Sequence, residues 1–326
     1  MMKTNRIAIV KIKDQSKAGS FFKSISPFNN RKDIPTRLFI IKNLLAYLLC
    51  NIGGMVIGTA IVVLIHYPLG KDPLKGEAFD GYLGLLFTML NYFLPSLFVM
   101  FYWRVIGKKK LSEMYVKRGV YYFIGCFVGG LLVTLCAGLI LLTGAVKVSG
   151  LTSHPDYLAI ALNGGVWAFQ SFHEEILCRG LAFSCLKGKL GVPAAFALST
   201  AAFTIPHLSS MKGAGAVVTA AGIVNLMLIS AIFTLIMLLT DSLWAACGAH
   251  FLWNFFLGNI FGLTVSGAVS ESPALISAES VGRNVLNGGI FGIEASIITT
   301  MVLAAGTAVL FFAWRKKNME KATVSA

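Results

Sequence analysis

The stretch GAVVTAAGIVNLMLISAIFTLIMLL, residues 215–239, contains 25 consecutive residues without a charged side chain. A helix needs about 20 mostly apolar residues to cross a bilayer, so this stretch is predicted to be a transmembrane helix. The rest of the chain shares its character. Of the 326 residues, 56% are hydrophobic and 13% are charged, and the mean hydropathy is +0.75. This composition excludes an ordinary soluble domain.

Further apolar stretches flank this one on both sides, and length and hydropathy predict that they also span the membrane. They are residues 44–67, 82–103, 119–145, 157–186, 193–210, 243–264 and 288–314. The predicted fold class is therefore all-α, a polytopic membrane protein with about eight transmembrane helices.

The remaining segments are polar. Residues 1–36 are basic and lack the apolar core of a secretory signal peptide, so they are predicted to form a cytoplasmic tail. Residues 37–326 are expected to form a single membrane domain. Residues 265–287 are rich in Ser, Gly and Asn, which predicts an irregular external loop.

Lysine and arginine are divided unevenly between the predicted connections. If the N terminus is cytoplasmic, the segments on its side contain 22 of them and the segments on the opposite side contain 5. This positive-inside bias predicts that both termini are cytoplasmic. The net charge of +14 is then explained by topology and by attraction to the anionic lipid bilayer, so no nucleic-acid partner is expected. The short loops favour a bacterial plasma membrane.

The predicted span 157–186 contains the sequence FHEEILCRG, residues 172–180. Ionisable side chains at membrane depth are costly and are usually functional. On a helix, Glu175 and Arg179 are four residues apart in the order that favours an ion pair, whereas Glu174 points about 100° away. We therefore expect Glu175 and Arg179 to support the site and Glu174 to carry the chemistry. A purely structural polar cluster between helices is the alternative reading.

Two later spans also carry polar groups. FTIPHL, residues 203–208, places His207 four residues after Phe203, and HFLWNF, residues 250–255, places His250 and Asn254 on one helix face. Each motif alone could be a hydrogen-bonding contact between helices. Counting about 1.5 Å per residue from the predicted cytoplasmic helix ends puts these groups and Glu174 about 10 to 21 Å deep, which predicts one shared site.

The predicted catalytic set, Glu174, His207, His250 and Asn254, suits one kind of chemistry. A carboxylate and an imidazole can hold and deprotonate a water, while a second imidazole and an amide can donate to a developing oxyanion. Such a set can direct water onto an amide carbonyl without a covalent intermediate. Cys178 is a weaker nucleophile candidate, because hydrocarbon disfavours a thiolate.

No cofactor is expected, with zinc as the alternative. Two histidines and a glutamate could bind zinc, and His173 lies beside Glu174, but the HExxH spacing of zinc proteases is absent. The six cysteines are scattered singly, without CxxC spacing, and are predicted to be small buried hydrophobes rather than disulfides.

Together the three motifs, Glu174-Glu175-xxx-Arg179, Phe203-xxx-His207 and His250-xxx-Asn254, resemble those of the CAAX proteases and bacteriocin-processing enzymes, the CPBP or Abi family of intramembrane glutamic endopeptidases. The resemblance covers about residues 155–265. It implies an eight-helix fold related to the Ras-converting CAAX endopeptidases, with Glu174 and His207 holding the catalytic water.

The resemblance further implies that His250 and Asn254 form the oxyanion hole. The implied substrates are membrane-associated or lipidated peptides, or other membrane proteins. Two other functions are considered beside this one. The first is a non-catalytic immunity or regulatory protein on the same fold, although binding alone would not require an ionisable Glu174. The second is a transporter, although the two halves of the chain lack the matching broken spans of inverted repeats.

Overall fold

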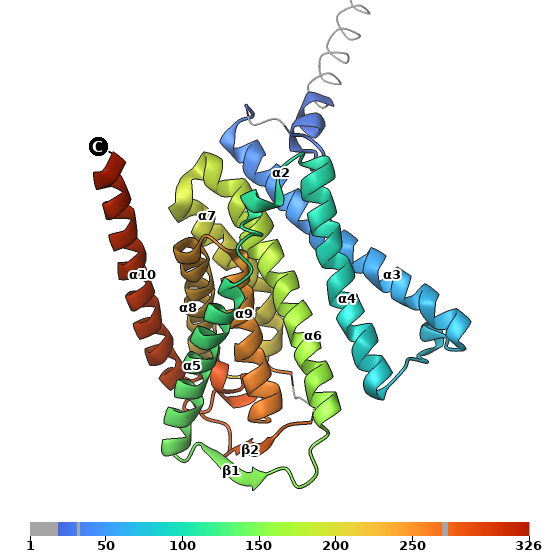
Figure 1. Cartoon of the computed structure of the whole chain (residues 1–326), viewed down its shortest axis with the longest axis vertical. Coiled ribbons are helices and arrows are strands. Elements are labelled where there is room, and N and C mark those ends of the chain that lie inside the picture. Colours follow the sequence, from blue (N-terminus) through green and yellow to red (C-terminus); the bar gives the residue numbers. More distant parts are fainter. Residues whose placement is uncertain (1–18, 31–32, 269–272, 326) are drawn as a thin grey trace, which may run out of the picture.

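The computed structural model describes residues 19–30, 33–268 and 273–325, which fold almost entirely into helices (Figure 1). Most of the predicted basic tail lies outside these ranges. The long helices are α2 (Thr36–Leu48), α3 (Gly54–His66), α4 (Gly81–Phe101), α5 (Tyr121–Leu142), α6 (Tyr157–Glu175), α7 (Ser184–His207), α8 (Ala216–Thr240), α9 (Leu243–Phe255) and α10 (Ile297–Ser325). Wider helical turns continue several of them, over Leu49–Gly53, Tyr102–Ile106, Ile176–Phe183 and Phe256–Ile260.

Within the described ranges, six helical stretches are long and apolar enough to cross a bilayer. They are Thr36–Leu69, Gly81–Ile106, Tyr121–Leu142, Tyr157–Met211, Ala216–Thr240 and Ile297–Thr323. The chain is therefore an all-α polytopic integral membrane protein, as predicted.

The stretch Tyr157–Met211 consists of two helical segments that run in opposite directions, rather than one continuous helix. Gly191 has φ +78°, a left-handed conformation that interrupts α7 and turns the chain back. The returning segment then packs against the widened turn after α6, where the hydroxyl of Ser199 donates to the backbone oxygen of Cys178 at 2.8 Å. These segments correspond to the predicted spans 157–186 and 193–210, and α9 with Phe256–Ile260 corresponds to the span 243–264.

Two predicted boundaries are wrong. The span predicted at 288–314 begins only at Ile297, because Gly288, Gly289 and Gly292 adopt positive φ values of 71°, 58° and 86° that a helix cannot accommodate. The span predicted at 44–67 also begins earlier than residue 44, because its helix, α2, begins at Thr36.

The segment predicted to be an irregular loop contains a strand. β2 (Ile276–Ser280) pairs antiparallel with β1 (Val146–Leu151) in a two-stranded sheet. Each strand alternates apolar and polar residues over only four positions, 146–149 and 276–279, and the two strands are far apart in the sequence. The prediction of an irregular loop at 265–287 therefore missed the pairing. The sheet closes one end of the bundle, at the bottom of Figure 1.

The connections rich in Lys and Arg meet at the opposite end, which we call the basic end. It comprises the described parts of residues 19–35 together with 102–118, 184–191, 239–242 and 315–321. Contacts that join these segments are Asn30 Nδ2 to Ile106 O at 2.5 Å, Lys187 Nζ to Tyr115 Oη at 2.5 Å, Lys117 Nζ to Asp241 Oδ2 at 2.7 Å, and Lys317 Nζ to Leu239 O. We call the other end the hairpin end; it comprises residues 67–80, 143–156, 208–215 and the described parts of 261–296.

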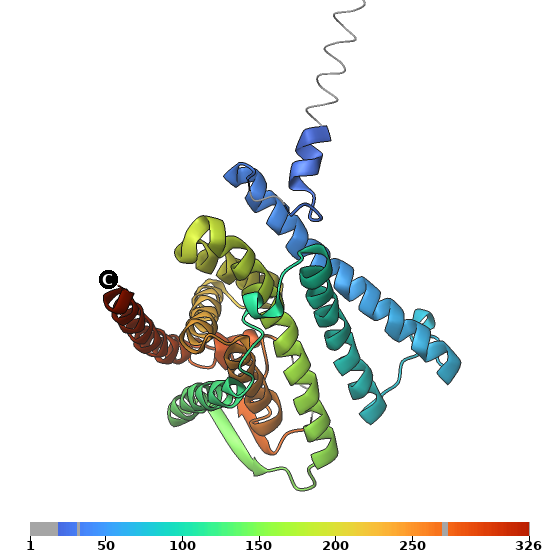
Figure 2. The ribbon, with the colours of Figure 1, turned by 45° about the horizontal axis from the view of Figure 1, so that its top comes forward.

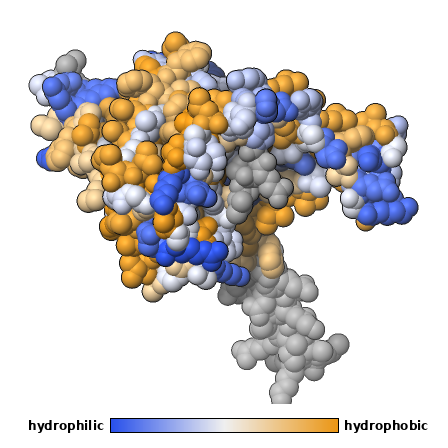
Figure 3. Space-filling view, turned by 90° about the horizontal axis from the view of Figure 1, so that it is seen from below, coloured by the Kyte–Doolittle hydropathy of each residue, from blue (hydrophilic) through white to orange (hydrophobic). Residues whose placement is uncertain are grey.

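The helices form a central bundle around α9, and α3 and α4 pack beside this bundle. α9 packs against α5, α6 and α8, while α3 packs on α4 and α4 packs on α6 (Figure 2). Seen from the hairpin end, hydrophilic surface is gathered in patches between broad hydrophobic areas (Figure 3). A chain embedded in lipid is expected to show such a surface.

Small residues allow α5 and α9 to approach closely. A Cβ added at Gly125 would lie 2.0 Å from the backbone oxygen of Ala245, and one added at Gly248 would lie 2.1 Å from that of Tyr122. Close approach through small residues is the usual way in which transmembrane helices associate. It holds α9, which carries two of the predicted site residues, at a fixed distance from α5.

A methyl group at Gly129 is expected to push these two helices apart, because its Cβ would lie 2.1 Å from the backbone oxygen of Ala249. Gly129→Ala should therefore lower the melting temperature, with a cost of about 1–3 kcal/mol for overpacking. The matched control is Gly138→Ala on the same helix, where an added Cβ meets nothing within 4 Å and helix propensity rises equally. Thermal unfolding of both purified variants in detergent measures the difference, and equal melting temperatures would contradict the close approach.

Candidate active site

Glu174 and Glu175 are the last two residues of α6, directly before the helix widens over Ile176–Phe183. Widened turns of this kind occur frequently at functional sites. Arg179 lies within the widened turn, and its Nη1 donates to Glu175 Oε1 at 2.9 Å. Both side chains are fully buried. The ion pair that the spacing predicts is therefore present.

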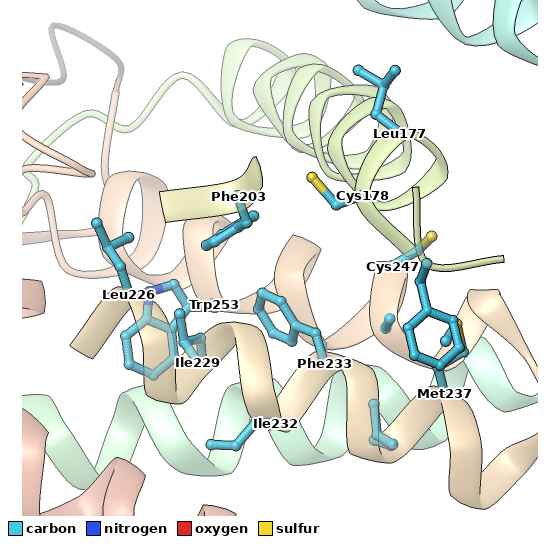
Figure 4. Packing of buried hydrophobic residues seen from close by; sticks show 14 of the residues in the cluster. Leu177, Cys178, Phe203, Leu226, Ile229, Ile232, Phe233, Met237, Cys247 and Trp253 are labelled. Atoms are coloured by element: carbon cyan, nitrogen blue, oxygen red, sulfur yellow. The ribbon is translucent and has the colours of Figure 1, made fainter. Parts of the chain in front are cut away.

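The guanidinium of Arg179 is also held by α8. Its Nη2 donates to the backbone oxygen of Ser230 at 3.1 Å and to its hydroxyl at 2.6 Å. The rings of Phe203 and Phe233 lie 4.6 and 5.4 Å from the guanidinium carbon, and both rings are seen in the packed interior in Figure 4. The charge is thus compensated by a carboxylate, hydrogen bonds and two aromatic faces.

His250 on α9 shares the carboxylate of Glu175. Its Nδ1 lies 3.0 Å from Glu175 Oε1, and its ring stacks on Phe233 at 5.0 Å between centroids. Glu175 therefore joins α6 to α9 as well as binding Arg179. The spacing of the sequence motifs gave no sign of this second partner.

Glu174 points into a cavity of about 330 Å³. Its Oε1 accepts a hydrogen bond from Gln170 Nε2, whereas its Oε2 has no hydrogen-bond partner among the described residues. His250 Nε2 lies 4.0 Å from that oxygen. Glu174 thus lines the cavity and has one buried carboxylate oxygen without a hydrogen-bond partner among the described residues.

Gln170 connects the predicted base to a predicted oxyanion donor. It donates to Glu174, and its own Oε1 accepts from Asn254 Nδ2 at 3.0 Å. The sequence interpretation missed this residue. The available signal was its position four residues before Glu174, which puts both side chains on the same helix face.

His207 is the last residue of α7, and it lines the same cavity. Its Nδ1 lies 2.9 Å from the backbone oxygen of Phe203. A carbonyl oxygen can only accept, so Nδ1 carries the proton and Nε2 of the neutral ring is an acceptor. Phe203 thus orients His207 through its backbone and contacts Arg179 through its ring.

The structure brings the four predicted catalytic residues to one cavity, with Phe203 in its wall and Glu175 and Arg179 behind it. The cavity is lined by Tyr92, Trp167, Gln170, Glu174, Phe203, Pro206, His207, Ser210, Leu226, Ile229, Phe233, His250, Trp253, Asn254, Val265, Ser266, Ala268 and Glu294. These residues come from five of the long helices, α4, α6, α7, α8 and α9, and from connections at the hairpin end.

Glu294 is a second acidic residue in the cavity wall, which the sequence interpretation did not identify. It precedes α10, and its carboxylate accepts from Trp253 Nε1 at 2.9 Å and from the backbone amide and hydroxyl of Ser266. Burial raises the pKa of the Glu294 carboxyl, and the Ser266 amide, Trp253 and nearby His207 oppose this increase. Residue 294 falls within the span wrongly predicted at 288–314, where it carried no motif.

The other candidates lie apart from the cavity. Cys178 is buried, with its Sγ 4.0 Å from Tyr47 Oη, and all six cysteines are free. His173 faces α4, where its Nδ1 lies 3.4 Å from Ser96 Oγ. In the part of the chain that the structure describes, no three His, Cys, Asp or Glu side chains are arranged to hold a metal ion.

Comparison with known proteins identifies this region. Residues 157–256 match the family model described as Type II CAAX prenyl endopeptidase Rce1-like. No curated protein and no solved structure matches the chain. The matched segment runs from the first residue of α6 to just beyond α9, so it includes Glu174, His207, His250 and Asn254. Residues 157–256 are a domain of this membrane-protease family, the family that the three motifs indicate.

Glu175→Gln is expected to destabilise the protein more than Glu174→Gln. The first change leaves Arg179 as a buried charge without its carboxylate, which typically costs about 3–5 kcal/mol. The second change affects a side chain that is 26% exposed and has one free oxygen. Melting temperatures of the two purified variants test this order.

A double variant tests whether the loss of stability in Glu175→Gln comes from the uncompensated charge of Arg179. In Glu175→Gln with Arg179→Met, the uncompensated charge is gone, so the melting temperature should recover part of the way toward that of the native chain. If Glu175→Gln alone unfolds at the native temperature, the buried pair has no role in stability.

Proposed function

We propose, on the premise that residues 157–256 are a CAAX prenyl endopeptidase domain, that this chain hydrolyses peptide bonds of membrane-associated peptides or proteins with a water activated by Glu174 and His207. One observation carries the proposal. The carboxylate of Glu174, whose buried Oε2 has no hydrogen-bond partner among the described residues, and the ring of His207, whose Nε2 is an acceptor, belong to side chains that line the same cavity.

These two acceptors suit a single water molecule. A water has two O–H groups, so it can donate one to the carboxylate and one to the imidazole while its lone pairs face the substrate. Glu174 accepts a proton as the water oxygen bonds to the peptide carbonyl carbon. No covalent bond between protein and substrate is needed.

The carbonyl oxygen becomes an oxyanion in this step, and Asn254 can donate to it. The side-chain amide of Asn254 has two N–H groups, and the bond to Gln170 occupies one of them. His250 donates from Nε2 only when both of its ring nitrogens carry protons, because Nδ1 is directed at Glu175. Glu175 is the anion that balances the charge of such a ring. Donors held in place before the reaction contribute strongly to catalysis.

Collapse of the tetrahedral intermediate completes the reaction. The C–N bond breaks, Glu174 returns its proton to the leaving nitrogen, and the products are an amine and a carboxylic acid, which then loses its proton to water. Glu175 and Arg179 take no part in these transfers. They position His250 and the helix that carries Glu174.

Replacement of Glu174 by Gln should abolish most turnover and leave folding nearly unchanged. The amide keeps the shape and can bond Gln170, but it cannot accept the proton, so the rate should fall by about 10²- to 10⁴-fold. Cleavage of a model peptide by purified protein measures the loss. Glu279→Gln, at an exposed residue on β2, is the matched control and should cleave normally. A fully active Glu174→Gln enzyme would contradict the role of Glu174 as base.

Hydrolysis should not require a tightly bound metal ion, because the proposed base and donors complete the reaction. Purified protein treated with a chelator and then dialysed should retain its cleavage rate. Loss of activity on chelation, followed by recovery on addition of zinc, would contradict this prediction.

A further inference from the structure

We propose that the catalytic cavity opens on the extracytoplasmic side of the membrane and accepts peptide segments on that side, such as an exported peptide or the outer juxtamembrane segment of a membrane protein. The inference rests on the proposed hydrolysis for its substrate. The direction of the opening rests on separate observations.

The exposed part of the cavity wall lies at the hairpin end. Among the lining residues, Pro206, Ser210 and Ala268 are exposed, whereas the rest are half-buried or buried. Pro206 is in the last turn of α7, Ser210 is in the short helix Leu208–Met211 that follows, and Ala268 is in the connection after Phe256–Ile260. The opening is therefore formed by segments that join helices at one end of the bundle.

Chain direction supports this placement. α7 runs from the basic end to the hairpin end, and His207 is its last residue. α9 runs the same way, and Asn254 lies one residue before its end. Glu294 precedes α10, which runs back toward the basic end. Three helix termini thus bring cavity residues to the hairpin end.

The interior on the other side of the catalytic residues is closed. Moving from Glu174 toward the basic end, α6 continues into Arg179 and Phe183, α8 continues from Phe233 to Met237, and all four side chains are at most 1% exposed. In Figure 4, Phe233, Met237 and Cys247 belong to this packed apolar interior. These packed side chains lie between Glu174 and the basic end.

The basic end has a cavity of its own. It measures about 990 Å³, and its lining includes Lys42, Lys109, Lys117, Lys187 and Lys189. It shares no lining residue with the catalytic cavity, whose wall contains neither Lys nor Arg. The cationic residues that define the cytoplasmic side by the positive-inside rule are therefore gathered away from the catalytic opening.

The chemistry of the catalytic cavity narrows the substrate further. Its wall includes the carboxylates of Glu174 and Glu294 and several apolar rings, among them Trp167. About 330 Å³ holds a short extended segment and not a folded domain. Neutral or basic segments fit such a wall better than acidic ones, because like charges repel at short range.

Cysteine labelling in intact cells tests the direction of the opening. In a chain whose six native cysteines are replaced, Ser210→Cys and Ala268→Cys should react with a membrane-impermeant maleimide added outside. Lys110→Cys at the basic end should react only after permeabilisation. Inside-out vesicles should give the reverse pattern, which separates true protection from misfolding. Labelling of Lys110→Cys alone in intact cells would overturn the proposal.

A pair of reporters tests the substrate class. The same sequence-randomised segment is placed beside a single transmembrane helix, either on the outer or on the cytoplasmic face, and released tags are identified by mass spectrometry. Cells with the native chain should release the outer tags, and cells with Glu174→Gln should not. Release of cytoplasmic tags alone would overturn the orientation. Release of neither, with labelling as expected, would overturn the hydrolysis and leave the direction of the opening established.

Discussion

The charge of Arg179 is the constraint on which the centre of this protein depends. A guanidinium with no exposed surface must be compensated from every direction. Glu175, one helical turn away, supplies the opposite charge, and Ser230 on α8 accepts a hydrogen bond from the guanidinium. The aromatic rings of Phe203 and Phe233 lie against the guanidinium. Because these groups come from three helices, the compensation also fixes how those helices lie relative to one another.

The geometry of the proposed active site follows from this arrangement. Glu175 has a second partner in His250, so the same carboxylate that neutralises Arg179 also orients an imidazole on α9. Glu174, the preceding residue in the chain, points to a different side of α6 and into the cavity. Two adjacent glutamates thus lie in different surroundings, one in the packed interior and one at the cavity where we propose that water is activated, because a single helical step separates their directions.

Local rules predicted much of this fold and site. Hydropathy predicted the spans, and the four-residue spacing predicted the Glu175 and Arg179 pair. The rest depends on residues brought together by tertiary packing. Glu175 and His250 are 75 residues apart, Gln170 and Asn254 are 84 apart, and Arg179 and Ser230 are 51 apart. The same holds for Glu294, which reaches the cavity only because glycines delay the start of α10.

Gln170 gives its NH₂ group to Glu174 and its carbonyl to Asn254. A side-chain amide has one donor end and one acceptor end, so its orientation must satisfy both neighbours at once. A change of charge at Glu174 therefore alters the strength of its hydrogen bond with Gln170, and through the orientation of Gln170 it also affects the hydrogen bond with Asn254. The proposed base and the proposed oxyanion donor are therefore coupled through the orientation of one side-chain amide.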